Sequence, residues 1–106
     1  MSAAVDIYIP AKWHTSISDV LTAAGFQVAS QNCKLAGGTA GRQYSCTRDG
    51  ANITLTEIPL RDDPAYVAVL GLSRTKHRAE LLVARDALTE HGALDSDTYN
   101  QRSRNP

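Results

Sequence analysis

The chain has 106 residues, of which 42 % are hydrophobic and 21 % charged, and its eleven basic and eleven acidic side chains give no net charge at neutral pH. This size and composition are those of one globular domain and exclude a chain that is disordered over most of its length. The charges also balance within each half of the chain, which argues against electrostatic attraction to nucleic acid or to a membrane surface.

The N-terminal residues lack the features of a secretory signal. No basic region precedes an apolar run of roughly 7–15 residues, and Asp6 places a charge inside the longest apolar stretch of this segment. No window of the chain approaches the roughly 18 consecutive apolar residues of a membrane-spanning helix. The sequence therefore predicts a cytoplasmic protein with no membrane contact.

The N-terminal part of the chain predicts a strand followed by a helix. Val5, Ile7 and Ile9 alternate with more polar residues, as on a strand with one buried face. Apolar residues then recur at helical spacing up to residue 24, from a start within residues 11–16. A glycine at position 25 stands where a helix commonly ends.

A second strand is predicted to begin at Phe26. Its apolar residues Phe26 and Val28 have one parity, whereas Cys33 and Leu35 have the other. Because a strand exposes alternate residues on opposite faces, this change predicts a bulge or break near residues 30–32.

Asp49-Gly50 is the strongest local signal in the chain, because it supplies the positive φ angles that a two-residue type I′ turn requires. The turn fixes the register of the strands on either side. In that register apolar residues face apolar residues and opposite charges face each other. The predicted pairs are Arg48 with Ala51, Cys46 with Ile53, Tyr44 with Leu55 and Arg42 with Glu57.

A further turn around Thr39-Ala40 would add the preceding strand to this hairpin and set Cys33 opposite Cys46. Cross-strand cysteines lie within reach of a disulfide, whereas cytosolic thiols normally stay reduced and pack as small apolar side chains. The sequence leaves both states open. Two cysteines are too few for a disulfide scaffold and lack the paired C-x-x-C spacing of a zinc site.

The second half of the chain predicts one more strand, a second helix and a polar tail. The apolar run 66–72 fits either a buried strand or a short helix, and we favour the strand. A broad apolar face predicts a helix over residues 75–91, closed by Gly92. Residues 95–106 contain one aromatic and no aliphatic side chain, which predicts a mobile C-terminal tail outside a single domain of residues 1–94.

These elements predict an α+β fold. The expected order is β-α-β-β-β-β-α, with a mostly antiparallel five-stranded sheet and two helices packed on one of its faces.

Three segments combine residue types that favour contact with a partner. The loop 34–42 places glycines and a hydroxyl between two cations. The start of the second helix gathers cations, which the helix dipole disfavours at that end. In the N-terminal segment, a Trp beside an exposed Tyr is a combination typical of protein interfaces. Each segment also has a structural interpretation, as a mobile hairpin tip, a solvated helix face or a cap on the core. The residues predicted to contact a partner are Tyr8, Trp13, Lys34, Gly37, Gly38, Thr39, Gly41, Arg42, Arg74, Lys76 and Arg78.

The sequence contains no pattern that is typical of a catalytic or metal centre. It has neither a G-x-S-x-G nor an H-E-x-x-H motif, and its three histidines lie far apart. Asp62 and Asp63 are adjacent, which fits a turn and a cap better than a pair of catalytic carboxylates. We therefore expect no catalytic residue, no metal and no cofactor.

The segment ISDVLTAAGFQV, followed by the hairpin and ITLTEIP, is similar to one half of the glyoxalase and bleomycin-resistance family. This resemblance implies a small-ligand binder or an enzyme that works as a homodimer, with a pocket formed by the paired sheets. It also implies a metal-binding carboxylate at Glu57, with a first-strand ligand position near Ile7 or Tyr8. Neither of these two is a usual metal ligand, so the implied activity is metal-independent.

The absence of a catalytic pattern, together with the three candidate segments, favours a non-enzymatic protein-binding module. Such a module would act as an inhibitor, immunity or accessory protein by covering part of a partner's surface. The alternative is the glyoxalase-like homodimer. Nucleic-acid binding through Arg74, Lys76 and Arg78 is the least favoured function, because the chain lacks an overall excess of positive charge.

Overall fold

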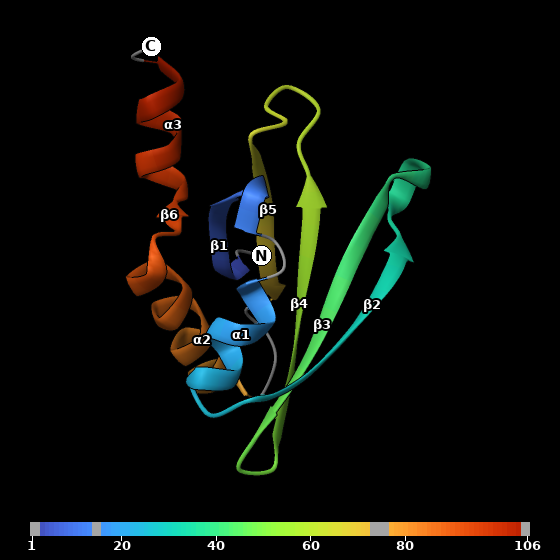
Figure 1. Ribbon diagram of the computed structural model, residues 1–106, viewed down its shortest axis with the longest axis vertical. Coiled ribbons are helices and arrows are strands. Elements are labelled where there is room, and N and C mark those ends of the chain that lie inside the picture. Colours follow the sequence, from blue (N-terminus) through green and yellow to red (C-terminus); the bar gives the residue numbers. More distant parts are fainter. Residues whose placement is uncertain (1–2, 14–15, 73–76, 105–106) are drawn as a thin grey trace.

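The protein is built on one antiparallel sheet of six strands in the order β2-β3-β4-β5-β1-β6 (Figure 1). The computed structural model describes residues 3–13, 16–72 and 77–104. In chain order the elements are β1 (Ala3–Pro10), η1 (Ala11–Trp13), α1 (Ser16–Ala23), β2 (Gln27–Lys34), η2 (Ala36–Gly38), β3 (Ala40–Arg48), β4 (Ala51–Pro59), β5 (Tyr66–Leu72), α2 (Arg78–His91), β6 (Leu94–Asp95) and α3 (Ser96–Arg104).

The predicted α+β class and antiparallel sheet are confirmed, but the predicted number of five strands is wrong. The sixth strand is β6, which pairs antiparallel with β1 and sets Leu94 opposite Tyr8. Sequence periodicity missed it because a strand of two residues is too short to show an alternation of apolar and polar side chains.

The core forms where the apolar face of the strands meets α1 and α2. Val5, Ile7 and Ile9 are fully buried, as their alternation predicted. The two helices contact each other, and each also contacts the sheet. Their buried side chains belong to the same cluster as those of the strands. From the helices this cluster contains Ile17, Leu21, Leu81, Ala84 and Leu88.

The β3–β4 hairpin has the predicted turn and register. Asp49 and Gly50 both have positive φ angles, of 51° and 80°, as a type I′ turn requires. Every predicted pair is present, from Arg48 with Ala51 next to the turn to Arg42 with Glu57 at the far end. The turn therefore determines which side chains of the two strands enter the core.

We expect Gly50→Val to lower the free energy of unfolding by about 1–3 kcal/mol, because a β-branched residue is strained at positive φ. A side chain at this position meets no other atom within 4 Å, so the effect is conformational and not steric. Gly38→Ala, at a φ of 82°, should cost less because alanine is not β-branched. Urea denaturation of both variants tests this order, and equal losses would contradict the turn assignment.

The predicted register between β2 and β3 is wrong. The chain reverses at η2, where Gly37 and Gly38 have φ angles of 83° and 82°, and not at residues 39–40. Cys33 therefore lies opposite Gly41, while Cys46 lies opposite Val28. The two glycines permit the earlier reversal because only glycine adopts positive φ readily.

This register excludes the predicted bulge and, of the two cysteine states that the sequence left open, agrees with the free thiols. All eight residues of β2 pair in sequence with β3, so no bulge interrupts residues 30–32. Both cysteines are free, and they lie five residues apart along the ladder, or roughly 16 Å. The change of parity between Val28 and Cys33 does not mark a bulge, because β2 is a largely exposed edge strand in which apolar residues need not all face one side.

Residues 66–72 form a strand, as favoured over a helix, and α2 runs to His91. Gly92 ends α2 with a φ of 125° and donates its N–H to the carbonyl groups of Leu88 and Thr89. The helix was predicted to begin at residue 75; it begins at Arg78, and residues 73–76 lie outside the described part of the chain.

The polar C-terminal segment has regular structure that its composition did not predict. Asp95 caps α3, because the Thr98 N–H donates to Asp95 Oδ1 at 2.7 Å. This hydrogen bond lowers the pKa of the exposed Asp95 carboxyl. The helix α3 contacts β1 and β6. The boundary after residue 94 and the mobility of residues 95–106 stay predictions.

Candidate functional site

The glycine-rich segment forms the exposed end of the β2–β3 hairpin. Lys34, Gly37 and Gly38 are exposed there, whereas Gly41 faces a crowded position. A Cβ at Gly41 would lie 2.9 Å from the Glu57 carbonyl oxygen and 2.9 Å from Leu35 Cδ1. Gly41 therefore permits the close approach of Leu35 and of the Glu57 backbone.

Arg42 lies opposite Glu57, which accepts a partly buried hydrogen bond from Tyr44. The Tyr44 hydroxyl donates to Glu57 Oε1 at 2.7 Å, and the ring is 1 % exposed. Burial and, next, this hydrogen bond raise the pKa of Tyr44 above its usual value, while Arg42 acts in the opposite direction. The Tyr44 phenol therefore stays neutral and donates its hydrogen bond to the Glu57 carboxylate.

Glu57 is the residue that the glyoxalase resemblance implied as a metal ligand. Its carboxylate is engaged by Tyr44. Within residues 3–13, 16–72 and 77–104, no three His, Cys, Asp or Glu side chains are grouped so that they could hold a metal ion. The metal role implied for Glu57 thus has no support in the described geometry.

The basic start of the second helix lies apart from the hairpin end. Arg78 is the exposed first residue of α2, whereas Arg74 and Lys76 fall outside the described residues. Next to Arg78 in the helix, Glu80 Oε2 accepts from Arg48 Nη1 at 3.1 Å. Arg48 and Arg42 occupy opposite ends of β3, roughly 20 Å apart. Arg78 and Arg42 consequently do not belong to one basic surface.

Tyr8 belongs to an aromatic cluster that sequence reasoning missed. Its ring stacks on Tyr99 with centroids 4.0 Å apart, and Tyr66 meets Tyr99 edge to face at 5.4 Å. The Tyr99 hydroxyl donates to Asp63 Oδ2 at 2.7 Å. Asp63 Oδ1 also accepts from the Ala65 N–H, as expected for a turn residue. The cluster holds α3 against β1 and uses Tyr8 within the chain.

Trp13, the other predicted aromatic contact, is the last residue of η1. The role predicted for its side chain falls outside the described part of the structure, and the predicted pairing of Trp13 with Tyr8 stays a prediction.

We expect Tyr99→Ala to lower the free energy of unfolding by about 1–3 kcal/mol, since it removes an aromatic stack and a hydrogen bond. Tyr99→Phe is the matched control, because it keeps the ring and loses only the hydroxyl. Its midpoint in urea should fall between those of the wild type and Tyr99→Ala. Equal midpoints for all three proteins would show that α3 is not held by this cluster.

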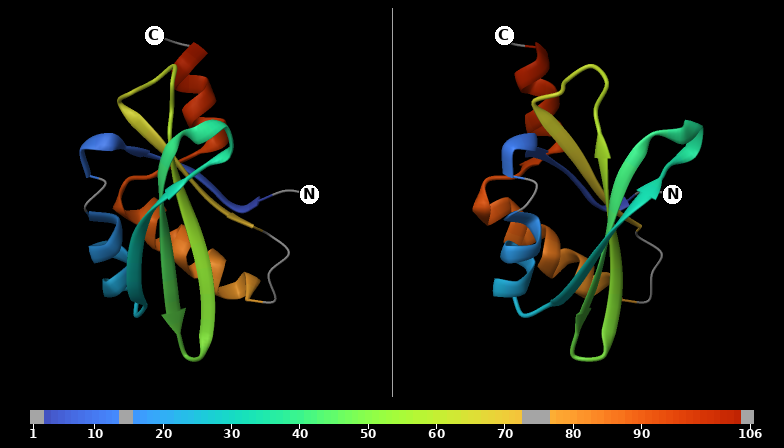
Figure 2. Two further views of the ribbon diagram at one scale, coloured as in Figure 1. Left: turned by 90° about the vertical axis from the view of Figure 1, so that its right-hand side faces the viewer. Right: turned by 45° about the vertical axis from the view of Figure 1, so that its right-hand side comes forward.

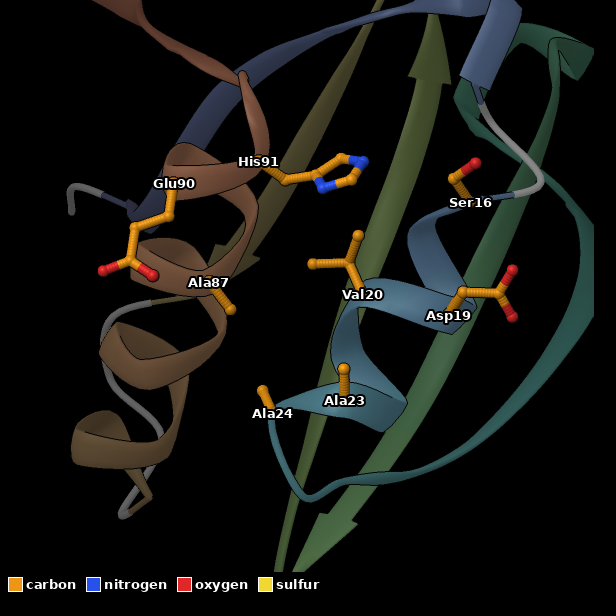
Figure 3. A pocket seen from close by; sticks show the side chains of 8 residues that line it. All are labelled: Ser16, Asp19, Val20, Ala23, Ala24, Ala87, Glu90 and His91. Carbon is orange, nitrogen blue, oxygen red and sulfur yellow. The ribbon is translucent and has the colours of Figure 1, made fainter.

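A groove of about 590 Å³ lies between α1 and α2 (Figure 3). Small apolar side chains form its floor, namely Val20, Ala23, Ala24 and Ala87. Figure 3 shows the His91 imidazole pointing across the groove, whereas the carboxylates of Asp19 and Glu90 point away from it on opposite sides. The groove is therefore lined mainly by small apolar side chains, with His91 reaching across it.

Cys46 is also unsuited to chemistry. Its side chain is completely buried, and this burial raises the pKa of the thiol to about 11. Because the thiolate is the reactive form of cysteine, Cys46 is a poor nucleophile near neutral pH. Cys33 is half-buried on β2.

A further surface is the side of β2 to β5 opposite the buried strand residues, which we call the outer face; Figure 2 shows these strands from two directions. It is formed by the residues that alternate with the buried ones. They are Gln27, Ala29, Gln31, Cys33, Gly41, Gln43, Ser45, Thr47, Asn52, Thr54, Thr56, Ile58 and Leu70. Tyr66 and Ala68 have the same parity on β5, but Ala68 is buried and Tyr66 packs against Tyr99 of α3, so the outer face does not include them.

None of these outer-face residues is charged, although charged residues make up 21 % of the chain. Two hollows, of about 460 and 280 Å³, lie along this face and share Gln43 and Thr54 in their linings. Asn52 Nδ2 donates to Ser45 Oγ at 3.2 Å and to Thr47 Oγ1 at 2.9 Å, which fixes these side chains across β3 and β4. The face is therefore an ordered, neutral surface of amide, hydroxyl and aliphatic groups.

The outer face was not predicted, because its residues follow only from the combined registers of three strand pairs, namely β2–β3, β3–β4 and β4–β5. The signal was nevertheless present in β3 and β4, whose alternate residues Gln43, Ser45, Thr54 and Thr56 are uncharged. Of the predicted site residues that the structure describes, Gly41 alone lies on it, so the outer face differs from the surfaces that those residues form.

No protein-family model matches this chain, and neither a curated protein nor a solved structure is significantly similar to it. Among the described residues, no helix has both the length and the apolar character needed to cross a membrane.

Proposed function

We propose that this protein is a non-enzymatic protein-binding module that acts by covering part of a partner's surface with its outer face. The observation that carries this proposal is the lack of charge on an exposed, ordered sheet surface. Charged residues are depleted in the centres of protein interfaces because each must lose its hydration on binding. We take α1 and α2 to lie together on the opposite face, which leaves the outer face open.

The chemistry of the outer face supports a protein partner more than a charged ligand. Its amide and hydroxyl groups can exchange hydrogen bonds with a partner at little desolvation cost, and Ile58 and Leu70 add a half-exposed aliphatic area. Polyanions such as nucleic acid require cations, which this face does not have. An inhibitor, immunity or accessory protein fits this surface.

Site-specific photocrosslinking tests the proposal. A benzoylphenylalanine introduced at Thr54, an exposed residue at the centre of the outer face, should give a discrete adduct with a second protein in native cell extract. The matched control carries the same group at Thr89, which is exposed on α2. No adduct at Thr54, or the same adducts at both positions, would contradict the proposal.

A charge placed beside the crosslinker shows whether the face itself is recognised. Thr56→Asp lies on the same strand and face as Thr54. We expect this substitution to reduce the Thr54 adduct by about tenfold or more, which corresponds to about 1.4 kcal/mol of binding free energy. An undiminished adduct would mean that the crosslinked protein reaches Thr54 without recognising the outer face, which would contradict the proposal.

A further inference from the structure

Within the described residues, the β2 strand forms one edge of the sheet and has β3 as its single neighbouring strand. It is as long as β1 and pairs with β3 over eight consecutive residues without interruption. Figure 1 shows β2 at the rim of the molecule, on the side away from α2 and α3. No other strand of the described residues pairs with this edge, although α1 also contacts β2.

The phase of the β2–β3 ladder shows which backbone groups these are. The Leu35 N–H donates to the Thr39 carbonyl at 2.7 Å next to η2. Hydrogen-bonded and non-hydrogen-bonded pairs alternate along an antiparallel ladder, so Cys33, Gln31 and Ala29 bond to β3. The N–H and C=O groups of the residues between them point to the open edge. Those residues are Val28, Ser30, Asn32 and Lys34.

This edge lacks the features by which sheet proteins usually prevent pairing. Such features are a proline, a bulge, a very short strand or a central charge. The β2 strand has no proline and no register shift, and its only charged residue is Lys34 at the end. The opposite edge of the sheet differs, since β6 has two residues and leads directly into α3.

We propose that β2 pairs antiparallel with β2 of a second copy of this chain, about a two-fold axis at Gln31. In this register the four outward residues pair only with one another: Ser30 faces Asn32, and Val28 faces Lys34. All their outward N–H and C=O groups then have partners, which gives eight hydrogen bonds across the axis. The two sheets become one continuous sheet. This inference is independent of the partner proposed for the outer face.

The strand is self-complementary in charge and size as well as in hydrogen bonding. The two copies of Lys34 lie at opposite ends of the new ladder, roughly 20 Å apart and beyond the screening length at physiological salt. The axis brings together the neutral side chains of Gln31, and Ala29 faces Cys33. The chain has no net charge to oppose association. These features favour a second copy over an unrelated peptide.

The difference between the two edges limits the assembly to a dimer. An open filament would require β2 of one copy to pair with β6 of the next, and β6 is only two residues long. Pairing of identical edges closes the assembly after two copies. Because one strand pair buries less area than a standard interface, we expect a reversible dimer with a dissociation constant in the micromolar to millimolar range.

Sedimentation velocity of the full chain over a range of concentrations tests the dimer. We expect Ser30→Pro to weaken dimerisation at least about tenfold, because it removes an outward N–H while leaving the β2–β3 hydrogen bonds intact. Ser30→Ala, which keeps the N–H, is the matched control and should dimerise like the wild type. If Ser30→Pro fails to fold, Ser30→Lys replaces it, since it sets a charge at the centre of the edge.

Engineered cysteines test the register. In a Cys33→Ser background, Gln31→Cys should form a disulfide-linked dimer under mild oxidation, because its two copies face each other at the axis. Gln27→Cys lies on the same face and is equally exposed, but its copies are roughly 26 Å apart in this register. It should therefore not be crosslinked.

Three results would overturn the inference. The first is a wild-type chain that remains monomeric at all accessible concentrations, even if its β2 edge binds an added peptide. Another is a dimer that Ser30→Pro and Ser30→Lys do not weaken. The third is equal crosslinking of Gln31→Cys and Gln27→Cys. None of these results bears on crosslinking at Thr54, so this inference and the proposed function can fail separately.

Discussion

Replacement of Gly71 by valine is expected to destabilise the domain by about 3 kcal/mol or more, at the upper end of the usual cost of overpacking a core. Gly71 is buried in β5. A Cβ there would lie 2.8 Å from Leu81 Cδ2, 3.0 Å from Leu55 Cδ2 and 3.2 Å from Val5 Cβ. These three contacts come from α2, β4 and β1, so no single element can move to relieve them.

Urea denaturation measures this loss, and Ala51→Val is its control. Ala51 is a half-exposed strand residue, so valine there adds the same branched side chain without entering the core. Its midpoint should stay close to that of the wild type. If Gly71→Val were no more destabilising than this control, α2 would not lie against β5 at the described distance.

Leu81→Ala is expected to lower the free energy of unfolding by about 2–5 kcal/mol, the range for truncating a buried leucine to alanine. Leu81 is 1 % exposed and lies in α2, with its Cδ2 directed at Gly71. Removal of its side chain leaves a cavity between α2 and the sheet, because the glycine opposite has no side chain to fill it. The measurement is again the urea midpoint and its slope.

The two substitutions should compensate each other in part. In the Leu81→Ala background, Gly71→Val places two methyl groups near the space that Leu81 occupied. The double variant should therefore be more stable than the sum of the single losses predicts, by about 0.5–3 kcal/mol. Strict additivity would contradict direct packing of Leu81 on Gly71, even if each single variant were destabilised as expected.

The parts of the fold that the sequence predicted are those determined by neighbouring residues. Asp49-Gly50 specifies its turn by local backbone preference, and this was enough to derive every pair between β3 and β4. The alternation of Val5, Ile7 and Ile9 identified the buried face of β1 for the same reason.

The sequence was misleading where the decisive interaction is non-local or the strand is exposed. At η2, two candidate reversals compete within a few residues, and β2 has too few buried side chains to choose between registers. In α3, the cap at Asp95 is a local signal that composition alone does not reveal. Tyr99 finds its partners Tyr8 and Asp63 only through the folded sheet.

The candidate surfaces also divide into those that neighbouring residues predict and those that depend on the folded arrangement of the strands. The hairpin end around Gly37 and the helix start at Arg78 could be found from composition, but their separation depends on the fold. The outer face and the open edge of β2 both depend on the register of β2 against β3, which sequence reasoning placed five residues away. Partner contacts at the hairpin end and at Arg78 stay predictions.

Residue-resolved amide hydrogen exchange of the monomer at low concentration tests the central claim, which is that β2 pairs with β3 in this register and leaves its other edge open. The amides of Ala29, Gln31 and Cys33 should exchange slowly, because they donate to β3, and those of Ser30 and Asn32 should exchange quickly. Slow exchange at Ser30 and Asn32 with fast exchange at Ala29 and Gln31, or uniform protection along β2, would contradict it.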